Sequence, residues 1–173
     1  MLLKTKRLTI RPIRAEDWPH IKAIWQDFQH SAYAQYDRPN STADADVRSR
    51  IARWAEMHDG AAHLFFAVCL DNAPIGYAVF HRRKNGYETG YCFHSAFHGN
   101  GYAKESLLCL FDHLRSLGAS RILAGTALAN TPSVALLKSL GFCLTGTEQV
   151  TFYRDADGND LFFEGGIFER KME

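Results

Sequence analysis

The chain lacks any large excess of charge of one sign, any long hydrophobic run and any close cysteine pair. Its 173 residues carry 20 Lys and Arg against 19 Asp and Glu, a net charge of +1, so no overall field favours nucleic acid or an anionic membrane as a partner. No stretch of about 18 consecutive apolar residues occurs, and residues 1–14 contain five basic residues without an apolar segment typical of a secretory signal. We therefore expect a cytoplasmic protein that selects its partner at a local site.

The cysteines point neither to disulfides nor to a metal centre. All four fall singly within apolar runs, which is typical of reduced core residues: Cys69, Cys92, Cys109 and Cys143. His94 and His98 lie close to Cys92 in the sequence, but a zinc site needs a third or fourth suitably placed ligand, and none is nearby. We predict no metal, and we expect Cys92 to be a packing residue because no partner for a nucleophilic cysteine can be named.

The apolar pattern predicts one domain over residues 1–173, since a chain that is 46% hydrophobic at this length supports one core and is short for two. Periodicity and turn signals predict the following elements in order: an outer strand at 5–14, helices at 17–30 and 47–60, strands at 63–70, 74–82 and 87–94, a helix at 102–117, a strand at 121–127, a helix at 131–140 and a closing hairpin at 144–168.

Several residues mark where these elements begin and end. Asp17 and Thr131 are the predicted N-caps of the first and last helices, Gly60 is expected to close the second helix, and Gly141 the last. A right-handed strand-helix-strand connection over residues 87–127 makes those two strands parallel in an otherwise antiparallel sheet. The fold class is therefore α+β, with a mixed sheet of about seven strands and four helices.

Residues 97–103, Phe-His-Gly-Asn-Gly-Tyr-Ala, follow a predicted strand and begin a predicted helix. Two glycines at a helix N-terminus let the backbone bend tightly and turn several N–H groups outward, where the helix dipole favours an anion. Such a turn binds phosphate. It is neither a P-loop, because no Gly-Lys-Ser/Thr follows, nor a dinucleotide fingerprint.

The segments around this turn carry a family resemblance. Glu88-Thr89-Gly90-Tyr91-Cys92-Phe93 precedes it, residues 130–142 (Asn-Thr-Pro-Ser through Leu-Gly-Phe) follow it, and residues 5–12 read Thr-Lys-Arg-Leu-Thr-Ile-Arg-Pro. Together these blocks resemble the GNAT superfamily, in particular its ribosomal-protein N-acetyltransferase-like group. The resemblance implies a mostly antiparallel twisted sheet with helices on both faces, splayed between its fourth and fifth strands. It also implies an N-acetyltransferase that uses acetyl-CoA and acts on a small-molecule amine or a protein N-terminus.

The resemblance further implies a set of residues that contact acetyl-CoA. The turn would hold the pyrophosphate through the backbone amides of His98, Gly99, Asn100, Gly101, Tyr102 and Ala103. The end of the preceding strand would pair with the pantetheine amides at Phe93, His94 and Ser95. The side chain of Asn130 would reach the cofactor arm. His98 stands where the group usually has Arg or Gln. A neutral imidazole offers a single donor, so we expect weaker or pH-sensitive binding that the amides still sustain.

Glu88 and Ser133 are the candidate catalytic residues. Glu88 lies where the related group often has a strand carboxylate facing the cleft and is the candidate base; the alternative is a surface glutamate at a strand end. Ser133, in the first turn of the last helix, is the candidate acid that protonates the departing thiolate. It is also expected to contact the cofactor. Many GNAT enzymes use a tyrosine at the position of Leu137, and its absence here favours Ser133, whose alternative role is to satisfy a backbone N–H.

Four aromatic residues near the first helix are candidates for the acceptor pocket: Trp25, Phe28, Tyr33 and Tyr36, with Trp25 and Phe28 equally suited to the core. A catalytically silent acyl-CoA-binding module remains an alternative function; it would keep the turn and Asn130 but need neither Glu88 nor Ser133. A plain interaction domain would need neither set. The protein is expected to be a monomer or a homodimer, and the closing hairpin could pair across a dimer.

Overall fold

The computed structural model describes residues 1–58 and 62–172. Within this part, eight strands form one mixed sheet in the order β1-β2-β3-β4-β5-β6-β8-β7. The strands are β1 (Leu3–Lys4), β2 (Thr9–Pro12), β3 (His63–Leu70), β4 (Ala73–Arg83), β5 (Gly86–Phe93), β6 (Arg121–Ala127), β7 (Cys143–Arg154) and β8 (Asp160–Lys171). All neighbours are antiparallel except β5 and β6.

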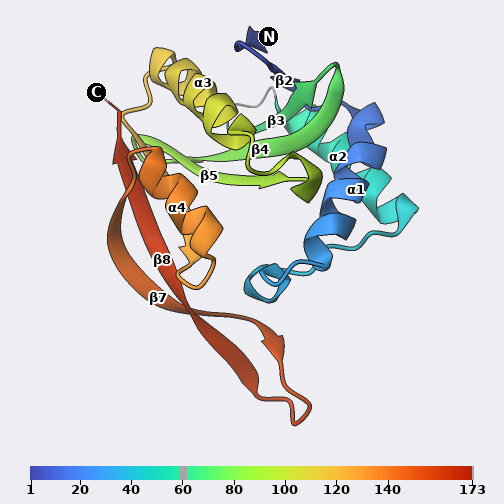
Figure 1. Cartoon of the computed structure of the whole chain (residues 1–173), viewed down its shortest axis with the longest axis vertical. Coiled ribbons are helices and arrows are strands. Elements are labelled where there is room, and N and C mark those ends of the chain that lie inside the picture. The colour runs from blue at the N-terminus through green and yellow to red at the C-terminus, as the bar shows by residue number, and fades with distance from the viewer. Residues whose placement is uncertain (59–61, 173) are drawn as a thin grey trace.

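Helices cover both faces of the sheet, and the fold class expected from the sequence is confirmed. Helices α1 (Trp18–Gln29) and α2 (Asp44–Met57) lie on one face, and α3 (Tyr102–Ser116) and α4 (Thr131–Ser139) on the other (Figure 1). Each pair buries an apolar stripe: Ile21 and Ile51 belong to one core cluster, and Leu107, Phe111 and Leu137 to the second. The hairpin of β7 and β8 extends beyond both layers (Figure 1).

Two features of the N-terminal segment differ from the prediction. The strand predicted at 5–14 is shorter, Thr9–Pro12, and it is not outermost, because the two-residue β1 pairs with it on its outer side. Two residues are too few to show a period, which explains why β1 was missed. Gly60, the predicted end of the second helix, lies outside the described residues; α2 itself ends at Met57.

Both predicted N-caps behave differently from the expectation. Asp17 stands at the N-cap of α1, but its carboxylate makes no cap bond there and instead binds the Arg11 guanidinium through two 2.7 Å contacts. The cap of α4 is Asn130 and not Thr131, since the Asn130 side chain accepts the N–H of Ser133 at 3.3 Å. The ion pair with Arg11 thus occupies the Asp17 carboxylate, whereas at α4 the choice of Asn130 over its neighbour is made by a local side-chain bond to the backbone.

The sheet opens between β5 and β6. These parallel strands pair only from Gly86 opposite Arg121 to Thr89 opposite Ala124. Beyond this point β5 stays with β4, as far as the pair Gly76 and Phe93, while β6 stays with β8. The last residues of the two strands therefore diverge, and their inner edges face a gap instead of each other.

Candidate active site

The glycine-punctuated turn presents free backbone donors at one end of this gap. Gly99 and Gly101 adopt left-handed conformations, with φ of 76° and 77°, and Gly101 is the N-cap of α3. The N–H of His98 is bonded to Ser95, but within the described part of the chain no protein acceptor is found for the N–H groups of residues 99–101. The first N–H groups of α3 have no intrahelical partner either. The turn is exposed, so its geometry suits an anion.

Arg7 adds a positive charge beside this turn. Its Nη2 would lie 3.6 Å from a Cβ placed on Gly101, and its guanidinium stacks over the Tyr102 ring at 4.5 Å. Glu105 pairs with the same guanidinium at 2.7 Å and fixes its position. In the sequence Arg7 is recognisable only as part of the opening motif. The tertiary structure brings it close to residue 101.

The His98 ring turns away from the turn and toward the preceding strand. Its Nε2 lies 2.8 Å from the carbonyl oxygen of Phe93. In this position the imidazole holds the end of β5 and is not directed at an anion on the amides. His98 therefore does not replace the arginine or glutamine usual at this position. A guanidinium comes instead from another segment, at Arg7.

The three strand-end residues predicted to contact the cofactor behave differently from one another. The N–H of His94 bonds to the carbonyl oxygen of Ile75 on β4 at 3.0 Å. Because bonded and non-bonded pairs alternate along an antiparallel ladder, the N–H of the preceding residue, Phe93, points away from β4 and toward the gap. Ser95 begins a 3₁₀ turn, η4 (Ser95–Phe97), and both its N–H and its hydroxyl bind the Asp27 carboxylate, at 2.7 and 2.6 Å. Of the three, only Phe93 has a backbone N–H directed into the gap, and this N–H also contacts the Cys92 thiol.

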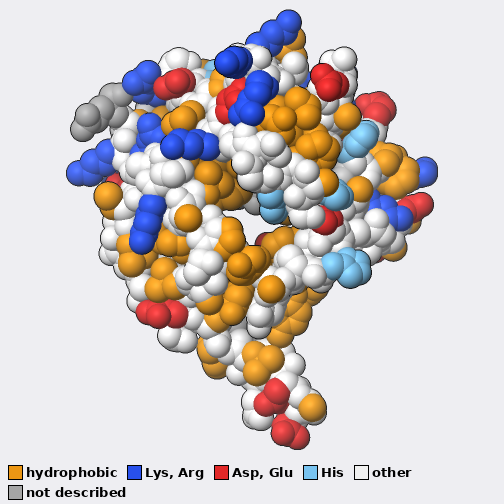
Figure 2. All heavy atoms as spheres, viewed as in Figure 1, with side chains coloured by type: hydrophobic (Ala, Val, Ile, Leu, Met, Phe, Trp, Pro, Cys, Tyr) orange, Lys and Arg blue, Asp and Glu red, His pale blue; other side chains and the backbone are white. Residues whose placement is uncertain are grey.

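A cavity of about 540 Å³ occupies the gap and continues toward α1 and the β7–β8 hairpin. The space-filling view shows the hollow near the centre of the face in Figure 2. Its lining brings together Glu88 and Tyr91 from β5 with Asn130 and Ser133 from the start of α4. The structure thus gathers the predicted catalytic residues around one space.

Glu88 reaches this cavity as a paired carboxylate. Its Oε2 lies 2.5 Å from Nη2 of Arg83, and 41% of its side chain is exposed. It stands opposite Leu123, in the part of the sheet where β5 and β6 are still joined. Glu88 is therefore a cavity residue, as predicted, but its carboxylate already forms an ion pair with a guanidinium.

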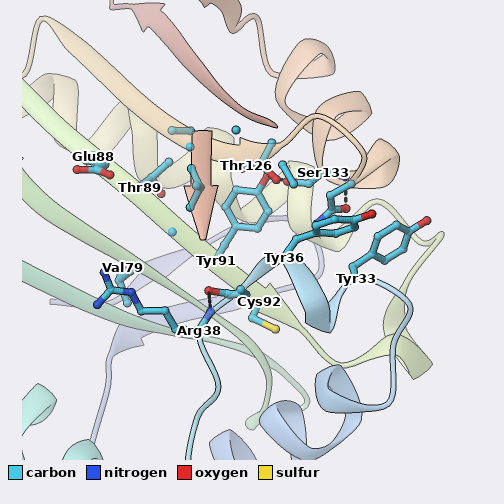
Figure 3. A pocket seen from close by; sticks show the side chains of 18 of the residues that line it. Tyr33, Tyr36, Arg38, Val79, Glu88, Thr89, Tyr91, Cys92, Thr126 and Ser133 are labelled. Atoms are coloured by element: carbon cyan, nitrogen blue, oxygen red, sulfur yellow. Dashed lines mark hydrogen bonds between the residues drawn. The ribbon is translucent and has the colours of Figure 1, made fainter. Parts of the chain in front are cut away.

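Ser133 is paired with a phenol that sequence reasoning did not assign. Its Oγ lies 3.1 Å from Oη of Tyr91, and Figure 3 shows the Tyr91 ring directed from β5 toward Ser133. Because Asn130 caps the helix, the Ser133 hydroxyl is not needed for that purpose. Burial raises the pKa of Tyr91, against the effect of the Ser133 hydrogen bond, so the phenol stays protonated. Leu137 is buried, and Tyr91 brings a phenol to this region from the opposite side.

The four candidate acceptor residues divide into core and cavity positions. Trp25 is 3% exposed and donates its indole N–H to Tyr77 Oη at 2.9 Å, so it serves mainly as a core residue at the cavity floor. Phe28, Tyr33 and Tyr36 are half-buried and line the cavity; Figure 3 places both tyrosines at its edge.

Cys92 lines the same cavity as a protonated thiol. Burial, reinforced by the nearby carboxylates of Asp37 and Asp27, raises its pKa to about 12. A thiol that holds its proton this strongly is a poor nucleophile at neutral pH.

The chain is similar to known proteins. The chain matches the acetyltransferase (GNAT) domain family over residues 7–143. It belongs to the GNAT acetyltransferase family. Among curated relatives, the uncharacterized N-acetyltransferase p20 of Bacillus licheniformis is 30% identical over 81% of both chains, and the uncharacterized N-acetyltransferase YnaD of Bacillus subtilis is 24% identical over 82% of both.

Solved GNAT structures share the fold over nearly the whole chain. A Salmonella typhimurium acetyltransferase that modifies the N-terminal serine of ribosomal protein L7/L12 superposes with a TM-score of 0.86, at 16% identity and full coverage of both chains. RimL, a ribosomal L7/L12 acetyltransferase, in complex with coenzyme A superposes with a TM-score of 0.84, at 16% identity over 99% of this chain and 98% of that one. In the described residues of the GNAT chain, no helix is long and apolar enough to span a membrane.

Proposed function

We propose that this GNAT protein transfers the acetyl group of acetyl-CoA to a primary amine by direct attack in a ternary complex. The observation that carries the proposal is the run of unpaired, exposed N–H groups at residues 99–101, at the mouth of a gap in the sheet that is lined by candidate proton donors and acceptors. Structural relatives that contain coenzyme A or acetyl-CoA support the choice of cosubstrate.

The chain offers suitable contacts along the length of such a molecule. The amides of the turn and the first turn of α3, together with Arg7, would bind the pyrophosphate. The outward N–H of Phe93 would pair with the pantetheine arm or polarise the thioester carbonyl. Asn130 is committed to capping α4 through its oxygen, which leaves its amide N–H groups as the donors for the cofactor arm.

The chemistry requires one proton to leave the amine and one to reach the thiolate. The amine nitrogen attacks the thioester carbon, a C–N bond forms and the C–S bond breaks. Glu88 is the proposed base, acting directly or through water while Arg83 orients it. Ser133 is the proposed donor to sulfur, and Tyr91 can replace the proton that it gives up. The N-terminal end of α4 favours the developing negative charge.

The acceptor is a small-molecule amine or a protein N-terminal amine. The Salmonella relative modifies an N-terminal serine, and a low sequence identity to it does not carry that acceptor over to this chain. The cavity volume of about 540 Å³ accommodates either a small amine or the first residue of a peptide.

Two measurements test the proposal. Saturating acetyl-CoA should raise the melting temperature, because a ligand that binds only the folded state stabilises it. A panel of amines should then release free CoA thiol in the presence of acetyl-CoA. A melting temperature that does not change at millimolar acetyl-CoA would refute the function, whereas a clear shift without turnover on any amine would identify a silent acyl-CoA-binding module.

A further inference from the structure

Asp37 is a carboxylate at the cavity wall that the chemistry above does not use. It follows the 3₁₀ turn η2 (Ala34–Tyr36), and its Oδ1 accepts the backbone N–H of Arg38 at 2.7 Å. Across the described residues no ion pair to this carboxylate is found. The guanidinium of Arg38 stacks instead over the Phe152 ring at 5.4 Å, and Figure 3 shows the Arg38 side chain extending away from Tyr91 and Ser133.

The surroundings of Asp37 lack the usual compensation for a negative charge. Asp37 is an exposed residue that lines the cavity, and partial burial of its carboxyl raises the pKa, against the opposing effects of the Arg38 N–H and guanidinium. Glu88, the other acid on the β5 side, is already paired with Arg83. Two carboxylates that line the cavity therefore have no ion pair within the described residues, Asp37 and Glu148 on β7, and Asp37 is the one next to the ring of Tyr36 in the chain.

Aromatic side chains form much of the wall around this carboxylate. Nine of the 29 lining residues are aromatic, which is a larger share than the 13% of aromatic residues in the whole chain. Tyr36, next to Asp37 in the chain, packs edge-on against Phe163 at 5.4 Å, and Phe163 contacts Phe152 at 5.7 Å. These rings come from η2 and from both strands of the β7–β8 hairpin, so the fold assembles an apolar surface in the cavity that Asp37 also lines.

A hydrogen bond joins the two segments that carry these rings. The hydroxyl of Tyr153 donates to the carbonyl of Ala34 at 3.3 Å, which links η2 to the hairpin. The Arg38 guanidinium lines the same cavity and would repel a second ammonium placed beside it, whereas Glu148 would attract one, so a comparison of a monoamine with spermidine decides between the two effects.

We propose that Asp37 binds the ammonium of the acceptor while the rings of Tyr36, Phe152 and Phe163 hold its apolar body, so that the acceptor is a primary monoamine bearing an aromatic or similarly flat group. The inference rests on the proposed acetyltransferase function and adds the acceptor class. Asp37 is a binding residue here, and proton removal remains with Glu88. The carboxylate contributes a charge-assisted hydrogen bond, and the rings contribute stacking and cation–π attraction.

The test uses 2-phenylethylamine as the acceptor probe. Asp37→Asn keeps the size of the side chain and removes its charge, and should raise KM for this amine about 10-fold to 100-fold while kcat changes little. Glu148→Gln is the matched control, since it removes the charge of an exposed carboxylate that lines the same cavity from β7; its KM should change less than about twofold. Asp37→Glu should restore much of the affinity, which separates loss of charge from loss of folding.

Competing acceptors give the opposing outcomes. Under identical conditions spermidine and a short peptide with a free N-terminus should show lower kcat/KM than 2-phenylethylamine, and 2-phenylethanol, which lacks the charge, should not inhibit. A higher kcat/KM for spermidine or the peptide, or an unchanged KM in Asp37→Asn, would overturn the inference.

A separate binding measurement keeps this inference distinct from the proposed function. Isothermal titration of 2-phenylethylamine into the protein saturated with CoA should show binding to the wild type and to Glu148→Gln, and none to Asp37→Asn. Binding that depends on Asp37, without turnover of this or any other amine of the panel, would reject the acetyltransferase function and retain the amine site. Absence of binding in the wild type would reject the amine site, whatever the result with other acceptors.

Discussion

Replacing Gly101 by leucine tests the anion site most directly. At φ of 77° a residue with a side chain is strained by about 1–2 kcal/mol, and the new Cβ would lie 3.6 Å from Arg7 Nη2. The larger side chain would cover the neighbouring N–H groups and displace the guanidinium. For a domain of this size each 1 kcal/mol lowers the melting temperature by about 2–4 °C, so the variant alone should melt about 2–8 °C lower.

The decisive quantity is the additional shift that acetyl-CoA produces. At about 100 times its dissociation constant a ligand adds about 2.7 kcal/mol of stability, which corresponds to about 5–11 °C at the same conversion. Wild-type protein should show this shift and Gly101→Leu should lose it.

Gly118→Leu is the matched control for this experiment. Gly118 has φ of 87°, follows the other end of α3, and a Cβ there would meet nothing within 4 Å. It should therefore carry a similar strain and keep the full acetyl-CoA shift. If thermal unfolding shows equal shifts in the two variants, the turn is not where the diphosphate binds.

Four further substitutions have separate expected outcomes. Glu88→Gln should lower kcat at least about tenfold and leave the acetyl-CoA shift intact; unchanged turnover across the pH range would remove Glu88 as the base. Ser133→Ala should slow turnover about tenfold or more and Tyr91→Phe less, with double-variant kinetics checking whether the effects are coupled as the 3.1 Å contact requires; additive losses would contradict the pairing. Asp27→Asn should cost about 1–2 kcal/mol at pH 7: hydrogen bonds from Ser95 lower the Asp27 pKa, although burial opposes them. This stability is present above the unfolded pKa of about 3.9 and lost as pH falls through the lower folded value, so in urea unfolding the two proteins should converge at acid pH.

The order of the elements follows from local signals in the sequence. The strands at 63–70 and 121–127 match β3 and β6 residue for residue. The turn between β3 and β4 has positive φ at both Asp71 and Asn72, because asparagine and aspartate tolerate the left-handed region that such turns require. Likewise, the prediction that residues 98–103 bind phosphate depends on two glycines and a following helix, which are neighbours in the chain.

Other parts of the candidate site depend on residues that are distant in the chain. The sequence by itself determined most of the strands and helices, the turn before α3 and the family resemblance, since backbone preferences and periodicity act over a few residues. Only the tertiary structure placed Arg7 beside Gly101, paired Tyr91 with Ser133 across 42 positions, and brought Asp37 and the hairpin rings to line one cavity. Those contacts depend on the divergence of β5 and β6 and on packing between distant segments, and no local pattern encodes the distance between two side chains that the fold brings together.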